Sequence, residues 1–206
     1  MSKNTFSGAV LILGACAVLA LVATAGASAP QNSNMNANGG MNHGSMKMTA
    51  DQKFAMEAAM GGLAEVEMGK VAASKGASDE VRQFGQRMVD DHSKANEELT
   101  RVVSSKGMTP PAALDAKHQA AVQKLSGLSG EKFDKEYVKM MVDDHKKDVG
   151  EFQKEASGGK DADIKAFASS TLPTLQEHLQ MIQRINDKMM MRKSGNLKST
   201  NANANM

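Results

Sequence analysis

The sequence lacks tryptophan, and its 206 residues include only one tyrosine and one cysteine. A single cysteine cannot form an intramolecular disulfide, so a hydrophobic core must stabilise any folded domain. A surplus of one charge is also missing, because the formal net charge is +2 and basic residues are interleaved with acidic ones. This balance does not predict a nucleic-acid-binding surface. Phosphate-cradling loops, nucleophile–base pairs and zinc-finger cysteine sets are absent from the sequence as well.

Long apolar runs are confined to the start of the chain. A lysine near the N-terminus precedes an apolar run over 9–23, and small residues follow at 25–27. This is the layout of a secretory signal, so we expect residues 1–27 to be removed and the mature protein to be exported. In an alternative interpretation, Cys16 becomes the lipidated first residue of a lipoprotein. The apolar run that continues beyond Cys16 favours simple cleavage.

Two segments rich in asparagine show no hydrophobic period. They are the linker 28–50, which is also rich in methionine, and the tail 193–206. Such compositions cannot bury enough apolar surface to fold, so we expect both segments to be disordered. The remaining residues, 51–192, have the size of one domain with a sizeable core.

Two parts of this domain resemble each other. Residues 73–84 align with 156–167 at a constant separation of 83 positions. Each copy reads as a helix end, a glycine-containing turn, an N-cap (Ser78 or Asp161) and an apolar-periodic helix. A two-helix hairpin cannot bury its apolar stripe alone, so we expect the two hairpins to pair. The predicted fold is all-α, a ferritin-like four-helix bundle of two repeated hairpins, with a short extra helix in the crossover.

The hydrophobic period also predicts where the helices lie. Thr49 and Gln52 have the spacing of a capping box at the first helix. Pro173 should bend the last helix, because it removes a backbone hydrogen bond. We expect helices over 51–74, from 79 to just before Gly107, over 112–125, from 130 and from 162.

Six ionisable residues interrupt or flank the apolar faces of these helices. Three are histidines at core positions on three different helices, one is a glutamate at a core position on the fourth, and two are aspartates that each precede a histidine. Four-helix bundles build metal sites from inward-pointing residues of these types, which suit zinc, iron or copper. The candidate metal ligands are therefore Glu65, Asp91, His92, Asp144, His145 and His178.

A structural interpretation of the histidines stays open beside the metal site. Any buried histidine needs a carboxylate or backbone partner, whatever its use. The three imidazoles can share an ion only if they lie at the same level of the bundle. Their level depends on how the hairpins are offset, which the sequence does not determine.

The spacing of the histidines argues against a di-iron enzyme. Such sites use Glu-x-x-His on two helices, but Val89, Val142 and Leu175 stand three residues before the histidines. We therefore expect a non-enzymatic binding or structural module. A metal-dependent enzyme with a different, non-standard site is the alternative.

A second metal site is conceivable in the N-terminal linker. Met41, His43 and Met46 carry thioether and imidazole groups, which bind copper(I) or silver(I). The favoured interpretation is a linker of biased composition without a ligand.

Several strings across the domain resemble one bacterial family, domain of unknown function 4142. The resemblance implies a ferritin-like fold and a periplasmic or outer-membrane-associated location, but no agreed activity. Association with the envelope and self-association stay open, and no small-molecule substrate can be identified. The matching strings are 58–69, 81–84, 88–92, 117–120, 128–130, 133–138, 141–145 and 171–179.

Overall fold

The computed structural model describes residues 48–203, with side chains up to Arg192. The predicted signal sequence, Cys16 and the linker residues Met41, His43 and Met46 lie outside this range. All regular structure within 48–203 is helical, which confirms the predicted all-α class. The five helices are α1 (Ala50–Lys75), α2 (Asp79–Ser105), α3 (Ala116–Ser126), α4 (Gly130–Gly158) and α5 (Ala162–Asn203).

The helix starts follow local capping chemistry. Thr49 and Gln52 form the predicted capping box at α1. Ser78 caps α2, and Asp161 accepts the backbone N–H groups of residues 163 and 164 at α5. The short helix α3 begins at Ala116, four residues later than predicted, because Asp115 serves as its N-cap and accepts the N–H of His118.

The last helix differs from expectation at its C-terminal end. It continues through Pro173 and runs to Asn203, whereas the sequence predicted a disordered tail from residue 193. The structure therefore places helical backbone over most of this segment. No proline follows Pro173, so no residue after it obliges the helix to stop.

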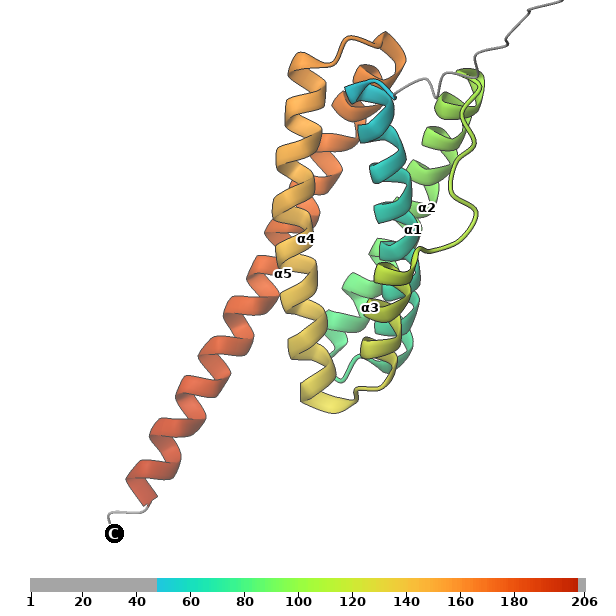
Figure 1. Cartoon of the computed structure of the whole chain (residues 1–206). Coiled ribbons are helices and arrows are strands. Elements are labelled where there is room, and N and C mark those ends of the chain that lie inside the picture. The colour runs from blue at the N-terminus through green and yellow to red at the C-terminus, as the bar shows by residue number, and fades with distance from the viewer. Residues whose placement is uncertain (1–47, 204–206) are drawn as a thin grey trace, which may run out of the picture. The chain divides into compact units, whose positions relative to one another are not determined.

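The four long helices form two antiparallel pairs, α1 with α2 and α4 with α5 (Figure 1). A carboxylate from each pair caps the turn of the other. Asp134 of α4 accepts the N–H groups of Ala77 and Ser78 at 2.8 and 2.9 Å. Asp51 of α1 accepts those of Lys160 and Asp161 at 2.8 and 2.6 Å. Asp51 and Asp134 are 83 positions apart, so the repeat includes this reciprocal contact.

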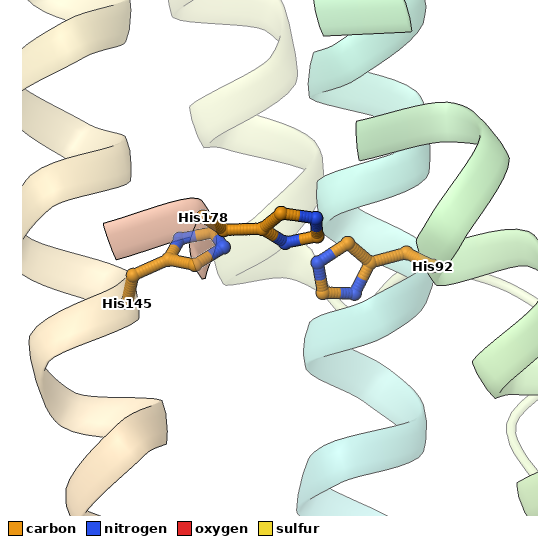
Figure 2. A group of neighbouring side chains, drawn as sticks. All are labelled: His92, His145 and His178. Atoms are coloured by element: carbon orange, nitrogen blue, oxygen red, sulfur yellow. The ribbon is translucent and has the colours of Figure 1, made fainter. Parts of the chain in front are cut away.

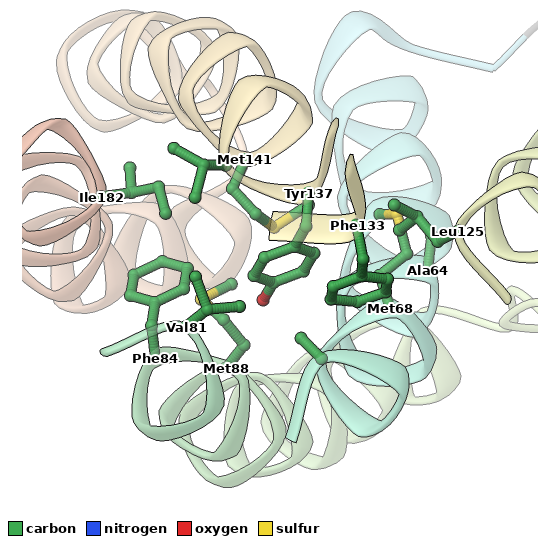
Figure 3. Close-up of a cluster of buried hydrophobic side chains, with 12 residues drawn as sticks. Ala64, Met68, Val81, Phe84, Met88, Leu125, Phe133, Tyr137, Met141 and Ile182 are labelled. Atoms are coloured by element: carbon green, nitrogen blue, oxygen red, sulfur yellow. The ribbon is translucent and has the colours of Figure 1, made fainter. Parts of the chain in front are cut away.

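The interior contains two apolar clusters, and each draws side chains from all four long helices. One cluster surrounds Phe84, Phe133, Tyr137 and Met141 (Figure 3). The other includes Leu99, Phe152, Ile164, Phe167 and Leu175. Along α2, α4 and α5 the predicted histidines fall between residues of the two clusters. The core is therefore apolar within each cluster and polar between the two clusters.

Candidate metal centre

Three histidines from three helices meet inside the domain. His92 comes from α2, His145 from α4 and His178 from α5, and their rings point toward one another (Figure 2). All three are buried, with exposed fractions of 5%, 0% and 0%. The ring centroids are 5.3–5.8 Å apart, so the histidines do lie at one level.

Each imidazole uses one ring nitrogen for a protein oxygen. The Nδ1 atom of His92 lies 3.0 Å from Oε2 of Glu65, and Nε2 of His178 lies 2.8 Å from Oδ2 of Asp91. The Nδ1 atom of His145 lies 3.0 Å from the carbonyl oxygen of Met141. Because each oxygen can accept a hydrogen bond, it favours the tautomer that carries the proton on that side of the ring.

The opposite nitrogen of each ring is left with a lone pair. These atoms are Nε2 of His92, Nε2 of His145 and Nδ1 of His178, and all three are buried without a hydrogen-bond partner among the described residues. One ligand atom from each histidine lies within 4.8 Å of the others. Some point therefore lies within about 2.8 Å of all three atoms, against about 2.0–2.1 Å for a zinc–nitrogen bond. Shifts of less than about 1 Å would bring the rings to bonding distance.

The electrostatics keep these imidazoles neutral. Burial lowers the pKa of His145 to about 3, with a further contribution from His178. Burial, together with His145 and His178, lowers the pKa of His92 well below its usual range. The pKa of His178 is also lowered by burial, although Asp91 opposes the shift. Neutral imidazole is the form that binds metal.

Glu65 completes the centre from α1. It is 4% exposed and lies beside two of the rings, with Oε1 3.5 Å from Nδ1 of His145. Burial, followed by the nearby charges of Asp148 and Asp144, raises the pKa of Glu65 well above its usual range. The carboxyl group therefore contacts the N–H sides of His92 and His145, away from the point where the lone pairs meet.

A family model describes most of this chain. It is a domain of unknown function, DUF4142, and it matches residues 36–185. The chain belongs to the DUF4142 family. The resemblance drawn from the sequence strings is thereby confirmed, and no curated protein matches the chain in sequence.

Solved structures of similar fold include two proteins of a second family, DUF305, and the protein CopM. A DUF305 fragment from Deinococcus radiodurans has a TM-score of 0.59 and 12% identity, and the match covers 68% of the DUF4142 chain and 97% of the fragment. CopM in its Cu(I)-bound form has a TM-score of 0.58 and 14% identity, with coverages of 69% and 99%. A DUF305 protein of Streptomyces coelicolor that is thought to be secreted has a TM-score of 0.56 and 15% identity, with coverages of 66% and 91%. At such identities the likeness concerns the fold.

The two aspartates predicted as ligands have different positions in this DUF4142 domain. Asp91 precedes His92 in sequence but contacts His178 on α5, and it also accepts from Arg87 at 2.9 Å. Although burial opposes the change, these two hydrogen bonds lower the pKa of Asp91. Asp144 lies outside the histidine group, and burial raises its pKa.

Sequence reasoning missed one acid near the centre. Burial raises the pKa of Asp148 to about 7, and its charge acts on Glu65. Asp148 stands 83 positions after Glu65, so the offset between the hairpins could have identified it.

Among residues 48–203, no helix is both long enough and apolar enough to cross a membrane.

Proposed function

We propose that this domain binds one transition-metal ion between His92, His145 and His178. The observation that carries the proposal is the convergence of three buried histidines, each of which keeps one ring nitrogen without a hydrogen-bond partner among the described residues (Figure 2). Three lone pairs facing one another repel, and a cation among them removes the repulsion. Purely structural histidines would be expected to satisfy both ring nitrogens with protein partners.

The surrounding groups have the arrangement expected around metal-binding histidines. Such histidines almost always donate their other N–H to a carboxylate, a backbone carbonyl or water. Glu65, the carbonyl of Met141 and Asp91 occupy these three positions. In this proposal Glu65 and Asp91 orient the ligands, and they do not bind the ion themselves.

Copper is the metal that we favour. Imidazole binds zinc, copper, iron and nickel. Three neutral ligands in a buried site suit a monovalent ion, because less charge has to be desolvated than for a divalent ion. CopM, which is similar in fold, was solved with Cu(I) bound.

The cellular setting is also part of the proposal. A signal-like N-terminus and the similarity to a protein thought to be secreted support export to the cell envelope. The two paired hairpins and their crossover helix support a ferritin-like four-helix bundle. Without Glu-x-x-His spacing or a nucleophile with its base, a binding protein is favoured over an enzyme.

Metal analysis and thermal melting test this function. Protein purified without chelator should contain about one metal ion per chain, or should take up one copper(I) ion under reducing conditions. Bound metal should raise the melting temperature, because binding to the native state alone stabilises it. His145→Leu and His178→Leu should abolish both the stoichiometric metal and the rise.

The matched control is His118→Leu. This histidine is half-buried on α3 and pairs with Asp115, so metal binding should survive its replacement. Circular dichroism would show that each variant remains helical. The proposal is overturned if the parent melts at the same temperature with and without copper, zinc or iron, or if the double variant His145→Leu/His178→Leu still binds a stoichiometric ion.

A further inference from the structure

A cleft of about 880 Å³ extends from the surface to His92 and Glu65 of the candidate metal centre. Its outer wall includes the exposed side chains of Lys53 and Lys117, so the cleft opens to solvent. Its inner wall includes Glu65 and His92, which are almost completely buried. The side chains between these ends come mainly from α1, α4 and the segment that contains α3. One continuous space therefore joins solvent to a residue of the candidate metal centre.

A glycine in the wall keeps this space open. Gly61 lies inside α1, where glycine is about 1 kcal/mol less favourable than alanine. A Cβ atom built at Gly61 meets nothing within 4 Å, so close packing does not explain this glycine. The adjacent Gly62 differs, because a Cβ atom there would collide with the side chain of Asn96. Gly61 lines the cleft, and a large side chain there would enter it.

The polar lining of the cleft favours a cation. Six carboxyl groups line the space, against three lysines. Lys53 and Lys147 pair with Glu57 and Glu151, at 3.6 and 3.1 Å. The carboxyl-bearing residues of the lining are Glu57, Glu65, Asp115, Asp144, Asp148 and Glu151.

Lys147 acts on Glu65 and Asp144 from a distance, and Lys117 acts on Asp144, but within residues 48–192 neither acid is neutralised by a direct contact. Among the described residues, neither Glu65 nor Asp144 forms an ion pair with a lysine or arginine. The Oε1 atom of Glu65 is buried and accepts no hydrogen bond. Asp144 and Asp148 are one helical turn apart on α4, between Glu65 and the surface. Oxygen ligands therefore continue along the cleft to its buried end.

We infer that this cleft is the passage through which a metal cation reaches the three histidines, with Asp144 and Asp148 as its cation-attracting wall. This inference rests on the proposed function. A passage differs from a ligand in one measurable respect. Blocking the passage alters the rates of metal binding and release together, whereas removing a metal ligand weakens the equilibrium affinity.

Filling the cleft at Gly61 is the sharpest test. Gly61→Phe should slow uptake of copper(I) from a coloured chelator at least about tenfold, and release by a similar factor, with Kd nearly unchanged. Gly150→Phe is the matched control, since Gly150 also has open space around its Cβ position but does not line the cleft. Gly61→Ala adds only a methyl group and should melt at or above the temperature of the parent.

A second pair of variants tests the carboxyl wall. At about pH 8, above the raised pKa of about 7 at Asp148, Asp144→Asn together with Asp148→Asn should slow uptake at low ionic strength by about tenfold, and added salt should reduce the difference. Asp143→Asn, on the exposed side of α4, should leave uptake unchanged. Normal rates in Gly61→Phe, with normal affinity, would overturn the passage and leave the metal site intact. A parent protein that binds no metal would overturn both proposals.

Discussion

The two hairpins share a framework but differ in how closely their helices pack. In the first hairpin, Gly69 of α1 faces Gly85 of α2, and a Cβ atom on either residue would lie 2.8 Å from a backbone oxygen of the other helix. The equivalent residues of the second hairpin, 83 positions later, are Phe152 and Ala168. Small residues allow backbones to approach, so α1 and α2 pack without large side chains between them at this level. In the second hairpin Phe152 contributes its ring to a core cluster instead.

The two hairpins also differ in their buried ionisable residues. The positions equivalent to His145 and His178 in the first hairpin are Gly62 and Ala95, and the position equivalent to His92 in the second is Leu175. The capping aspartates recur, whereas the histidines do not. The repeat therefore supplies the framework, and the candidate metal centre is an asymmetric addition that takes one ligand from the first hairpin and two from the second.

The largest expected effect comes from breaking the contact that the hairpins exchange. Asp134→Ala should lower the free energy of unfolding by about 2–4 kcal/mol, because two backbone N–H groups lose a charged acceptor in a buried position. Asp51→Ala should have a loss of similar size. Urea unfolding measures both, with the exposed neighbour Lys135→Ala as control.

The comparison of these two variants is itself informative. Equal losses would support two equivalent hairpins. A loss below about 0.5 kcal/mol in either variant is typical of an ordinary surface substitution and would contradict the capping role of that aspartate.

Much of this fold could be predicted from local sequence, because caps and hydrophobic period act over a few residues. Thr49, Ser78 and Asp161 marked three helix starts correctly. The start of α3 lies four residues after the predicted one, because the side chain of Asp115, and not the end of the proline pair, sets where this helix begins. Beyond residue 192 the asparagine-rich composition predicts disorder, whereas the backbone there continues α5 to Asn203.

Less of the candidate centre was predictable. Glu65 and the three histidines occupy helical positions in register with the apolar residues, and this periodicity predicts that they face inward. Their common level depends on the offset between hairpins, which is set by tertiary packing and has no local signal. For the same reason sequence adjacency paired Asp91 with His92, whereas the folded chain pairs Asp91 with His178 across two helices.

A smaller effect should distinguish the packing of the two hairpins. Gly85→Ala should destabilise the protein by about 1–3 kcal/mol, because the added methyl group would lie 2.7 Å from the Cβ atom of Ala72 and from the backbone nitrogen of Ala73. The converse change in the second hairpin, Ala168→Gly, should lose about 1 kcal/mol from helix propensity. Thermal melting of both variants gives the order. If Gly85→Ala is the milder change, the close approach of α1 and α2 does not constrain this position.

The smallest effect concerns Glu65 and Asp148, a second acidic position, beside the capping aspartates, that both hairpins retain. The pKa of Asp148 is raised to about 7 by burial, so between about pH 4 and 7 the folded state holds a proton that the unfolded state has lost. Its contribution to stability therefore grows as the pH falls through this range. The histidines act in the opposite sense. Their lowered pKa values favour folding above about pH 6.5, and that stability is lost on acidification.

The two contributions partly cancel in metal-free protein, and Asp148→Asn should remove one of them. Between pH 7 and 5 the variant should lose about 1–2 kcal/mol more stability than the parent, because the proton uptake of Asp148 no longer offsets the histidines, while Glu65 and Asp144 respond alike in both proteins. Asp90→Asn, an exposed change on α2, should follow the parent. Urea midpoints at several pH values measure the difference. If stability depends on pH in the same way in the parent and in Asp148→Asn, Asp148 takes up no proton on folding. The two hairpins would then share an acid at this position without sharing its effect on stability.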